Sequence, residues 1–436
     1  MTDRARRVPA HRRRLWQLVQ VLTLVGAVAV LSACGSDDNK SSSSSSSSSS
    51  GTSSESAKAP TGTPIVAYTF ADVNTQGPQY KNIEETARIY GEWVNAHGGI
   101  KGHPLKVKFC DAKGTPTDAT ACARKAVADK AVAVVGSFTF TGDAIVPTLS
   151  KGKVAYWGMC CAISASELTN PDAFPMGNQP LYAVGLMKRA KEDGCQKTNG
   201  VIIQGAEAFK PIMQNAAKSY GLPIGKFITL PATARDYSPQ VAEATGGGAD
   251  CLVMIVSETP YIAWMPAFAQ SGSKARMYGP QGNLNEKVAK GFEEVTNGDV
   301  IAGMYPDISL PQWKDYRTAL DQYNADKGED YNSLGGLGTW AAYQGFQQVI
   351  ESMSGPITNA TFLDAARTAK IDLPGMLPPE DFAKTWDKDG GPKGFDRLVD
   401  RCVVFSKLDN GKLKPLTTTF EDVSEAAGGK NPQNCG

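Results

Sequence analysis

Residues 105–136, LKVKFCDAKGTPTDATACARKAVADKAVAVVG, contain the pattern that decides the fold. LKVKFC alternates apolar and polar residues as a half-buried strand does, and AVAVVG (131–136) is a continuous apolar run, typical of a strand buried on both faces. The alanine-rich stretch between them predicts a helix with Thr117 or Asp118 as its cap. Strands joined through a helix lie parallel, so this stretch predicts an α/β fold.

The same order of elements continues on both sides of this stretch. TPIVAYTF (63–70) is a short apolar run, and a helical pattern follows it before residue 95. The second half repeats the order, with predicted strands at GVIIQG (200–205), KFITLP (226–231) and DCLVMIVS (250–257). About 370 residues follow Thr63, more than one hydrophobic core usually serves. We therefore expect two similar lobes with parallel sheets.

The last third of the chain differs from this repeat. Two longer helical patterns lie between residues 311 and 354. RCVVFSKLDNGKLKPL (401–416) predicts a hairpin that turns at Asn410 and Gly411. We expect the chain to cross between the lobes more than once. The approximate boundaries are residues 63–182 plus 307–372 for lobe I and 183–306 plus 373–436 for lobe II.

The N-terminal segment predicts export. Six arginines precede an apolar stretch over residues 15–31, as in a secretory signal. A membrane-spanning anchor is the alternative, but it needs about 20 mostly apolar residues, and this stretch is shorter and contains two glutamines. An arginine pair before Leu15 leaves the twin-arginine export route open.

The end of this segment predicts a lipid anchor. LSAC (31–34) resembles the lipobox of bacterial lipoproteins, which implies removal of residues 1–33 and acylation of Cys34. Two or three acyl chains hold a protein at a membrane more firmly than one. Ten consecutive serines follow, and residues 34–62 cannot bury apolar surface, so they predict a flexible tether. The expected location is the extracytoplasmic face of the cell membrane.

Charge and motifs exclude several classes of function. Removing the segment through Cys34, with its six arginines and one aspartate, changes the formal charge from +1 to −4, which argues against a nucleic-acid partner. The chain lacks GxxxxGK[ST], GxSxG and HExxH, and has no GxGxxG after its first strand. After Cys34 its histidines are His97 and His103, in a glycine-rich connection, which leaves few bases for catalysis. We expect that the protein has no enzymatic activity and binds neither a metal nor a cofactor.

The cysteines predict disulfides. Eight of them follow Cys34, which is the even number expected in an exported chain. The chain has no CxxC pair, which argues against a zinc site. Cys110 ends a predicted strand and Cys122 lies one turn into the next helix, which favours this pair. Cys195 and Cys251 each precede an apolar strand and are placed to meet across neighbouring strand starts. The others are Cys402 and Cys435 in the tail, and Cys160 and Cys161, as a vicinal bridge or in two separate links.

Six loops are candidates for a ligand site. In open α/β sheets, small ligands bind beyond the carboxyl ends of the strands. Hydroxyls, amides, aromatic rings and backbone N–H groups are enriched there, although any one loop also fits an ordinary solvated turn. Trp157 and Phe140 are candidates to stack on an apolar part of a ligand, unless they are core residues. The loops are residues 72–80, 137–142, 158–166, 204–209, 257–261 and 279–283.

From about Thr63 to Leu416, the chain resembles the leucine/isoleucine/valine-binding proteins of ABC importers. NAHGGIKGHPLKV (95–107), followed by the VVG strand, is the most specific part, and MYGPQGNLN (277–285) and WDKDGGPKGFDR (386–397) fit the same family. The resemblance implies a type I periplasmic binding-protein fold, in which three crossing strands hinge two Rossmann-like lobes that close on an amino acid. It also implies a membrane permease as the partner.

The resemblance also implies site residues. In the first lobe, Gln79 and Tyr80 fall in a ligand loop, and Thr139, Phe140 and Thr141 match the loop that takes the ligand carboxylate. Phe140 stands where the family has a serine, whose hydroxyl Thr139 or Thr141 would replace. The remaining candidates are Ala162 and Ser164 beside the amino group, Ser257 or Glu258 where a tyrosine is usual, and Gln281 in place of an acidic residue.

These observations lead to a first hypothesis and two alternatives. The first is a monomeric, lipid-anchored receptor that closes on a small polar ligand, such as an amino acid or a related amide or metabolite, and delivers it to an ABC permease. The second is a sensory receptor that reports a solute to a membrane signalling protein. The third is a secreted enzyme that uses the cleft between the lobes.

Overall fold

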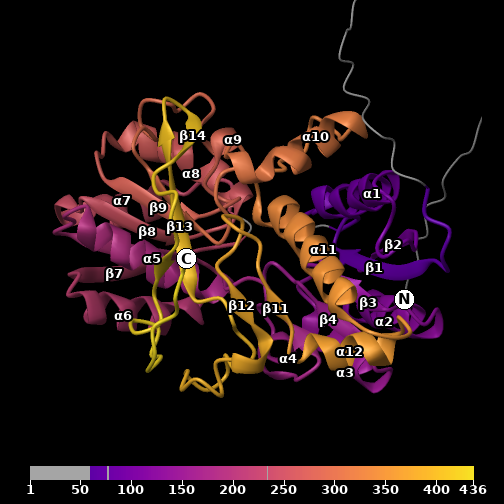
Figure 1. The fold of residues 1–436 in the computed structure, drawn as a ribbon. Coiled ribbons are helices and arrows are strands. Elements are labelled where there is room, and N and C mark those ends of the chain that lie inside the picture. The colour runs from indigo at the N-terminus through magenta and orange to yellow at the C-terminus, as the bar shows by residue number, and fades with distance from the viewer. Residues whose placement is uncertain (1–58, 76–77, 233) are drawn as a thin grey trace, which may run out of the picture. The chain divides into compact units, whose positions relative to one another are not determined.

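The computed structural model describes residues 59–75, 78–232 and 234–436, all within one compact unit of the chain, Glu55–Gly436. The predicted signal segment, Cys34 and most of the predicted tether lie outside the described residues. Within the described ranges, two α/β lobes are built on separate sheets, as Figure 1 shows. The predicted fold class is therefore confirmed. The predicted lobe boundaries stay a prediction.

The first lobe is built on a five-stranded parallel sheet. Its strands are β1 (Ile65–Ala71), β2 (Leu105–Asp111), β3 (Ala133–Val135), β4 (Ala155–Trp157) and β5 (Ala173–Phe174). Their order across the sheet is β2-β1-β3-β4-β5. β3 is buried along its whole length, as the apolar run over residues 131–136 predicts.

Helices cover both faces of this sheet. α1 (Lys81–Ala96), α11 (Leu334–Ser352) and α12 (Asn359–Ala366) pack on the face that presents Ala67 and Val135. α2 (Pro116–Ala128), α3 (Gly142–Lys151) and the short α4 (Ala165–Thr169) pack on the opposite face, which presents Tyr68 and Val134. Successive residues of a strand point to opposite faces, so the apolar strands contribute to two cores.

The second lobe is built on an eight-stranded sheet. Its strands are β6 (Thr198–Ile203), β7 (Ile224–Leu230), β8 (Cys251–Ile255), β9 (Arg276–Pro280), β10 (Val300–Gly303), β13 (Cys402–Asp409), β14 (Lys412–Pro415) and β15 (Glu421–Asp422). The order is β14-β13-β10-β9-β8-β6-β7, and β15 pairs with β13. β6 to β10 are parallel, and β13, β14 and β15 are antiparallel additions.

Helices also sandwich the second sheet. One face carries α5 (Gln179–Glu192) and α6 (Phe209–Tyr220), and the other carries α7 (Ser238–Thr245), α8 (Glu258–Ser271) and α9 (Glu286–Ala289). The remaining elements are α10 (Lys314–Gln322), the pair β11 (Lys370–Ile371) and β12 (Glu380–Asp381), and the 3₁₀ turns η1 (Gly246–Gly248), η2 (Pro311–Trp313) and η3 (Phe382–Lys384).

Two local predictions are tested at turns and helix ends. The hairpin between β13 and β14 turns at Asn410 and Gly411, both with positive φ, as predicted. The predicted cap of α2 is wrong, because the helix begins at Pro116 and its cap is Thr115, whose Oγ1 accepts a hydrogen bond from Asp118 N at 3.1 Å. Proline fits the first helical turn because its missing N–H has no partner there in any case.

The described residues contain four disulfides. They join Cys110 to Cys122 and Cys195 to Cys251, the two pairs that the strand and helix positions favoured. The tail cysteines pair with each other, and the adjacent cysteines after β4 form the vicinal bridge rather than two separate links. These bonds join Cys402 to Cys435 and Cys160 to Cys161.

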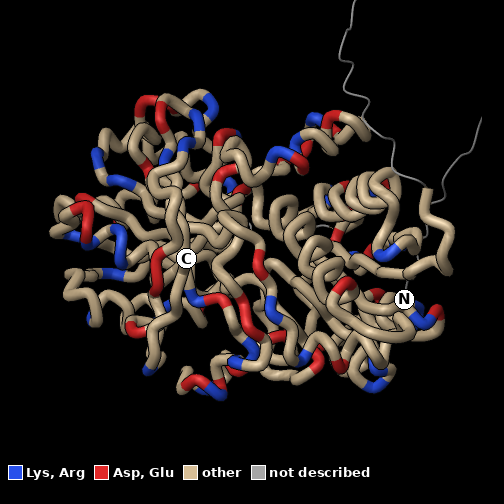
Figure 2. The backbone as a smooth tube through the Cα atoms, viewed as in Figure 1, with Lys and Arg blue, Asp and Glu red and all other residues tan. Residues whose placement is uncertain are grey.

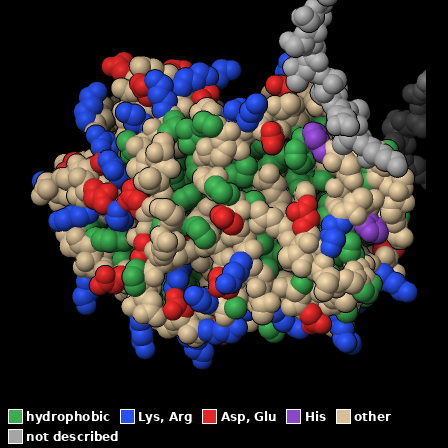
Figure 3. Space-filling view, in the orientation of Figure 1, with side chains coloured by type: hydrophobic (Ala, Val, Ile, Leu, Met, Phe, Trp, Pro, Cys, Tyr) green, Lys and Arg blue, Asp and Glu red, His purple; other side chains and the backbone are tan. Residues whose placement is uncertain are grey.

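Charged residues of both signs are interspersed over the outer helices and loops (Figure 2). In the space-filling view of the same side, hydrophobic side chains are visible in the middle of the face, and Lys and Arg protrude mainly at its left and lower margins (Figure 3). In the described part of the chain, no helix is long and apolar enough to cross a membrane.

Candidate ligand-binding site

The chain passes between the two sheets at three places, and these crossings meet. The first leads from β5 to α5 through Asn178, the second leaves β10 at Met304, and the third enters β13 at Cys402. The backbone N–H of Asn178 donates to Met304 Sδ at 2.7 Å, and its side-chain Nδ2 donates to the carbonyl oxygen of Cys402 at 2.6 Å. One fully buried asparagine therefore ties all three crossings together.

Aromatic side chains gather where β1 and β3 end. Tyr80, at the end of the loop after β1, packs edge-on against Phe138, with ring centroids 4.8 Å apart. Phe140 lies 5.3 Å from Phe138 and 6.2 Å from Tyr80, between ring centroids. Phe138 is buried, whereas Phe140 exposes 51% of its surface, so this aromatic group presents one open ring.

A buried carboxylate holds the loop that carries Phe140. Asp72 Oδ2 accepts from Phe140 N at 3.1 Å, and Oδ1 accepts from Gly114 N at 2.8 Å. Burial raises the pKa of Asp72, although both backbone bonds oppose that shift. Asp72 directly follows β1 and was not singled out from the sequence, because its partners come from two other loops. Its role is to position the loop.

The two threonines that flank Phe140 differ in accessibility. Thr139 is fully buried, and its Oγ1 accepts a hydrogen bond from Thr141 N at 3.1 Å. Thr141 is half-buried at the start of α3, and its hydroxyl lies 3.3 Å from Thr139 Oγ1. Thr141 therefore presents the accessible hydroxyl of this loop, and Thr139 supports it.

The other first-lobe candidates lie on a separate loop or at its edge. Ala162 is fully buried, and Ser164 caps α4 by accepting from Glu167 N at 3.4 Å. Glu167 Oε2 in turn accepts from the backbone N–H groups of residues 163 and 164, and burial raises the pKa of Glu167 to about 7. Gln79 is exposed and donates from Nε2 to Thr75 O at 3.1 Å. The structure therefore assigns a local structural partner to Ser164 and to Gln79.

In the second lobe, Ser257 and Glu258 begin α8. Ser257 is half-buried, and its side chain makes no capping bond. Glu258 uses both carboxylate oxygens, since Oε2 accepts from Asn285 Nδ2 at 2.7 Å and Oε1 pairs with Lys287 Nζ at 2.6 Å. Glu258 therefore already has a cationic partner within its own lobe.

Gln281 is bound to the backbone of the second crossing. Its Nε2 donates to Tyr305 O at 2.9 Å, and its Oε1 lies 3.2 Å from Met304 N and 3.3 Å from Tyr305 N. The side chain is 9% exposed, and a Cβ atom on Gly303 would lie 2.1 Å from Gln281 Oε1. Glycine at position 303 is therefore required for this contact.

Two aromatic residues of the second lobe stack on each other, and sequence reasoning missed one of them. Tyr182 of α5 stacks on Phe209 of α6, with ring centroids 5.6 Å apart and an interplanar angle of 14°. Burial raises the pKa of Tyr80, and the negative charge of Asp72 adds to the effect. Phe209 ends one predicted loop, but no pattern distinguished Tyr182.

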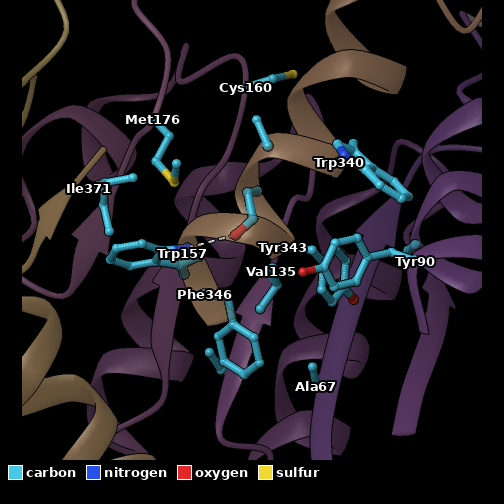
Figure 4. Close-up of a cluster of buried hydrophobic side chains, with 14 of the residues drawn as sticks. Ala67, Tyr90, Val135, Trp157, Cys160, Met176, Trp340, Tyr343, Phe346 and Ile371 are labelled. Carbon is cyan, nitrogen blue, oxygen red and sulfur yellow. Dashed lines mark hydrogen bonds between the residues drawn. The ribbon is translucent and has the colours of Figure 1, made fainter. Parts of the chain in front are cut away.

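Trp157 does not face this region, so its proposed stacking role is wrong. It is fully buried, its ring contacts Phe174, Phe362 and Phe382, and its Nε1 donates to Ala342 O at 3.0 Å. Figure 4 shows Trp157 in the core near Met176 and Ile371. Two hollows of about 310 and 400 Å³ also lie elsewhere, at the amino ends of β6 and β7 and beside α1 and β2.

Residues 75–412 match the family model described as periplasmic binding protein. No curated protein sequence matches the chain.

Solved structures share the fold at low sequence identity. A leucine-binding protein from Thermotoga maritima has a TM-score of 0.63 at 15% identity, over 82% of this chain and 98% of that chain. A fatty acid ABC transporter substrate-binding protein from Thermomonospora curvata has 0.66 at 18%, over 85% and 95%. A solute-binding protein from Rhodopseudomonas palustris, in complex with benzoate, has 0.63 at 15%, over 81% and 96%. With its two lobes and three crossings, the chain belongs to the type I periplasmic binding-protein family.

Proposed function

We propose that this protein is an extracytoplasmic receptor that closes its two lobes on a small ligand and delivers the ligand to the permease of an ABC importer. The observation that carries the proposal is the meeting of the three crossings at Asn178, beside loops of both lobes. A hinge of this kind favours the closed form only when a ligand contacts both lobes. The permease can then distinguish the filled receptor from the empty one.

The ligand is proposed to be a small polar molecule, such as an amino acid or a related amide or metabolite. Thr141 and Ser257 support this proposal, because both are half-buried side chains at the starts of α3 and α8, one in each lobe. The fold neighbours include binders of leucine, fatty acids and benzoate, so the fold itself accepts several ligand classes.

The anchor is proposed to be a lipid on Cys34, followed by the serine-rich tether. A flexible chain of about 28 residues has an r.m.s. span of roughly 30 Å, which lets the receptor reach a permease in the same membrane. Labelling of cells with a radioactive fatty acid, with Cys34→Ala as the variant, tests this proposal. We expect label on the unchanged chain and none on the variant, and a labelled variant would contradict it.

A thermal-shift screen of the full chain in detergent tests ligand binding. The panel contains amino acids, short amides, polyols and aromatic acids, and a ligand at 100 times its Kd stabilises the folded state by about 2.7 kcal/mol. Thr141→Val should weaken binding of the compound found, whereas Thr318→Val, on an exposed site of α10, should leave binding unchanged. Uptake of that compound by cells lacking this chain should fall. No shift across the panel, or unchanged uptake, would argue against an import receptor.

A further inference from the structure

The six candidate loops contain very little charge. Residues 72–80, 137–142, 158–166, 204–209, 257–261 and 279–283 include no lysine, arginine or histidine, although 20% of the chain is charged. Their acidic residues are Asp72, Glu207 and Glu258. The candidate loops therefore offer no cationic side chain to a ligand carboxylate and few carboxylates to a ligand ammonium group.

The carboxylates of these three acidic residues already have hydrogen-bond or ion-pair partners. Both oxygens of Asp72 accept backbone N–H groups, and both oxygens of Glu207 accept from Gly205 N at 2.9 and 3.0 Å. Glu258 pairs with Lys287 and Asn285. An ammonium group buried among these three carboxylates would have to share oxygens that already accept backbone or lysine N–H groups, so less of its lost hydration would be replaced.

Aromatic rings lie in these loops and beside them. Tyr80, Phe138 and Phe140 form a contiguous group in the first lobe, and Tyr182 stacks on Phe209 in the second. Among the large hydrophobic side chains of the described residues, only Phe140 and Ile262 are exposed, by 51% and 39%. Phe140 lies at the end of the aromatic group, with its backbone fixed by Asp72, so its open ring is held in position.

We infer that the ligand carries a planar aromatic ring, which packs against Phe140 and the rings beside it, and that it has no ammonium group. This inference rests on the proposed function and narrows its ligand class to molecules other than amino acids. Aromatic pairs gain free energy from edge-to-face or offset contact in addition to the burial of apolar surface. The polar end of such a ligand would meet hydroxyl and backbone N–H groups near Thr141, which bind a carboxylate or an amide without a cationic side chain.

Equilibrium titration of the full chain in detergent tests the inference with three probes. Benzoate and benzamide carry the ring with two different polar ends, and leucine carries the zwitterion without a ring. We expect an aromatic probe to bind at least about tenfold more tightly than leucine. Phe140→Leu keeps an apolar side chain without the ring, and should weaken the aromatic probe by about tenfold. Ile262→Ala, at the other exposed hydrophobic residue, is the matched control and should have no effect.

Each outcome separates this inference from the proposed function. Tighter binding of leucine than of both aromatic probes would overturn the inference and would still support a solute receptor. If Phe140→Leu and Ile262→Ala weakened binding of the aromatic probe equally, or if Phe140→Leu did not weaken it, the proposed role of the Phe140 ring would be overturned. Failure of both aromatic probes to bind would overturn the inference as well. Only failure of the whole screening panel, together with unchanged uptake, would count against the receptor itself.

Discussion

The side-chain Nδ2 of Asn178 donates a hydrogen bond of 2.6 Å to the carbonyl oxygen of Cys402, and this bond joins the first crossing between the lobes to the third. Both residues are fully buried. A buried carbonyl that loses its donor retains the full cost of its desolvation, so this contact constrains the crossings more than an exposed bond would. The side chain of Asn178 thus fixes the hinge region where the first and third crossings meet.

We predict that Asn178→Ala lowers the free energy of unfolding by about 1–3 kcal/mol, because it removes the donor to the Cys402 carbonyl. Urea denaturation of the full chain measures this change. Asn215→Ala, which alters an exposed asparagine of α6, is the matched control and should change stability little. An equal effect of the two substitutions would show that the bond to Cys402 contributes nothing specific.

Gln281→Glu should destabilise the protein rather than create a leucine site. The new carboxylate would place an oxygen against Tyr305 O, where Gln281 Nε2 now donates at 2.9 Å. Two facing acceptors in a buried position cost about 1–3 kcal/mol. We expect a lower Tm, with partial recovery at acidic pH, where a protonated glutamate can donate to the carbonyl again.

Asn283→Asp is the control for this charge change, since it adds a carboxylate two residues away, at a half-buried position. Its effect on Tm should be smaller and should depend less on pH. A clear gain in leucine affinity for Gln281→Glu without a loss of Tm would contradict this account of Gln281.

Glu167 should make the protein less stable as the pH rises. Burial raises the pKa of this fully buried carboxyl to about 7 in the folded state, against about 4.3 in an unfolded chain. Because the folded state holds the proton more tightly, the stabilising contribution of Glu167 is complete below about pH 4.3 and is lost as the pH rises through about 7.

Glu167→Gln keeps an acceptor for the N–H groups of Ile163 and Ser164 and removes the titration. At pH 8 we expect the variant to be more stable than the unchanged chain by about 1–3 kcal/mol, and the difference to shrink toward pH 5. Chemical denaturation across this range measures it. Glu243→Gln, at an exposed site of α7, should not change the pH dependence. A difference that grows toward low pH would contradict the prediction.

The fold was largely predictable because its signals are local. Alternating or continuous apolar runs identify the strands, and the sequence Asn410-Gly411 identifies the hairpin turn. The cap of α2 was misplaced only because Pro116 moves the helix start ahead of Thr117. Patterns over a few residues therefore determine most of the elements and their order.

The candidate site was less predictable because its contacts are distant in the sequence. Whether Trp157 faces a ligand or the core depends on α11, and its hydrogen-bond partner Ala342 lies 185 positions away. Glu258 and Gln281 matched positions of the family pattern, but their partners are distant in the sequence. Lys287 lies beside Glu258 only when β8 and β9 are neighbours, and the backbone of Tyr305 lies beside Gln281 only when β9 and β10 are neighbours. Sequence patterns identify which loops follow neighbouring strands, but not which side chains lack a partner within the protein.

Loop length should determine how much each disulfide stabilises the chain. Cys195–Cys251 spans 56 positions and Cys110–Cys122 spans 12, so chain entropy predicts losses of about 4 and about 3 kcal/mol on removal. Alanine pairs at these positions remove the same two sulfur atoms, and urea denaturation compares them. The vicinal pair Cys160–Cys161 closes almost no loop, so its alanine variant measures the packing loss alone. Equal losses for all three pairs would contradict the chain-entropy explanation.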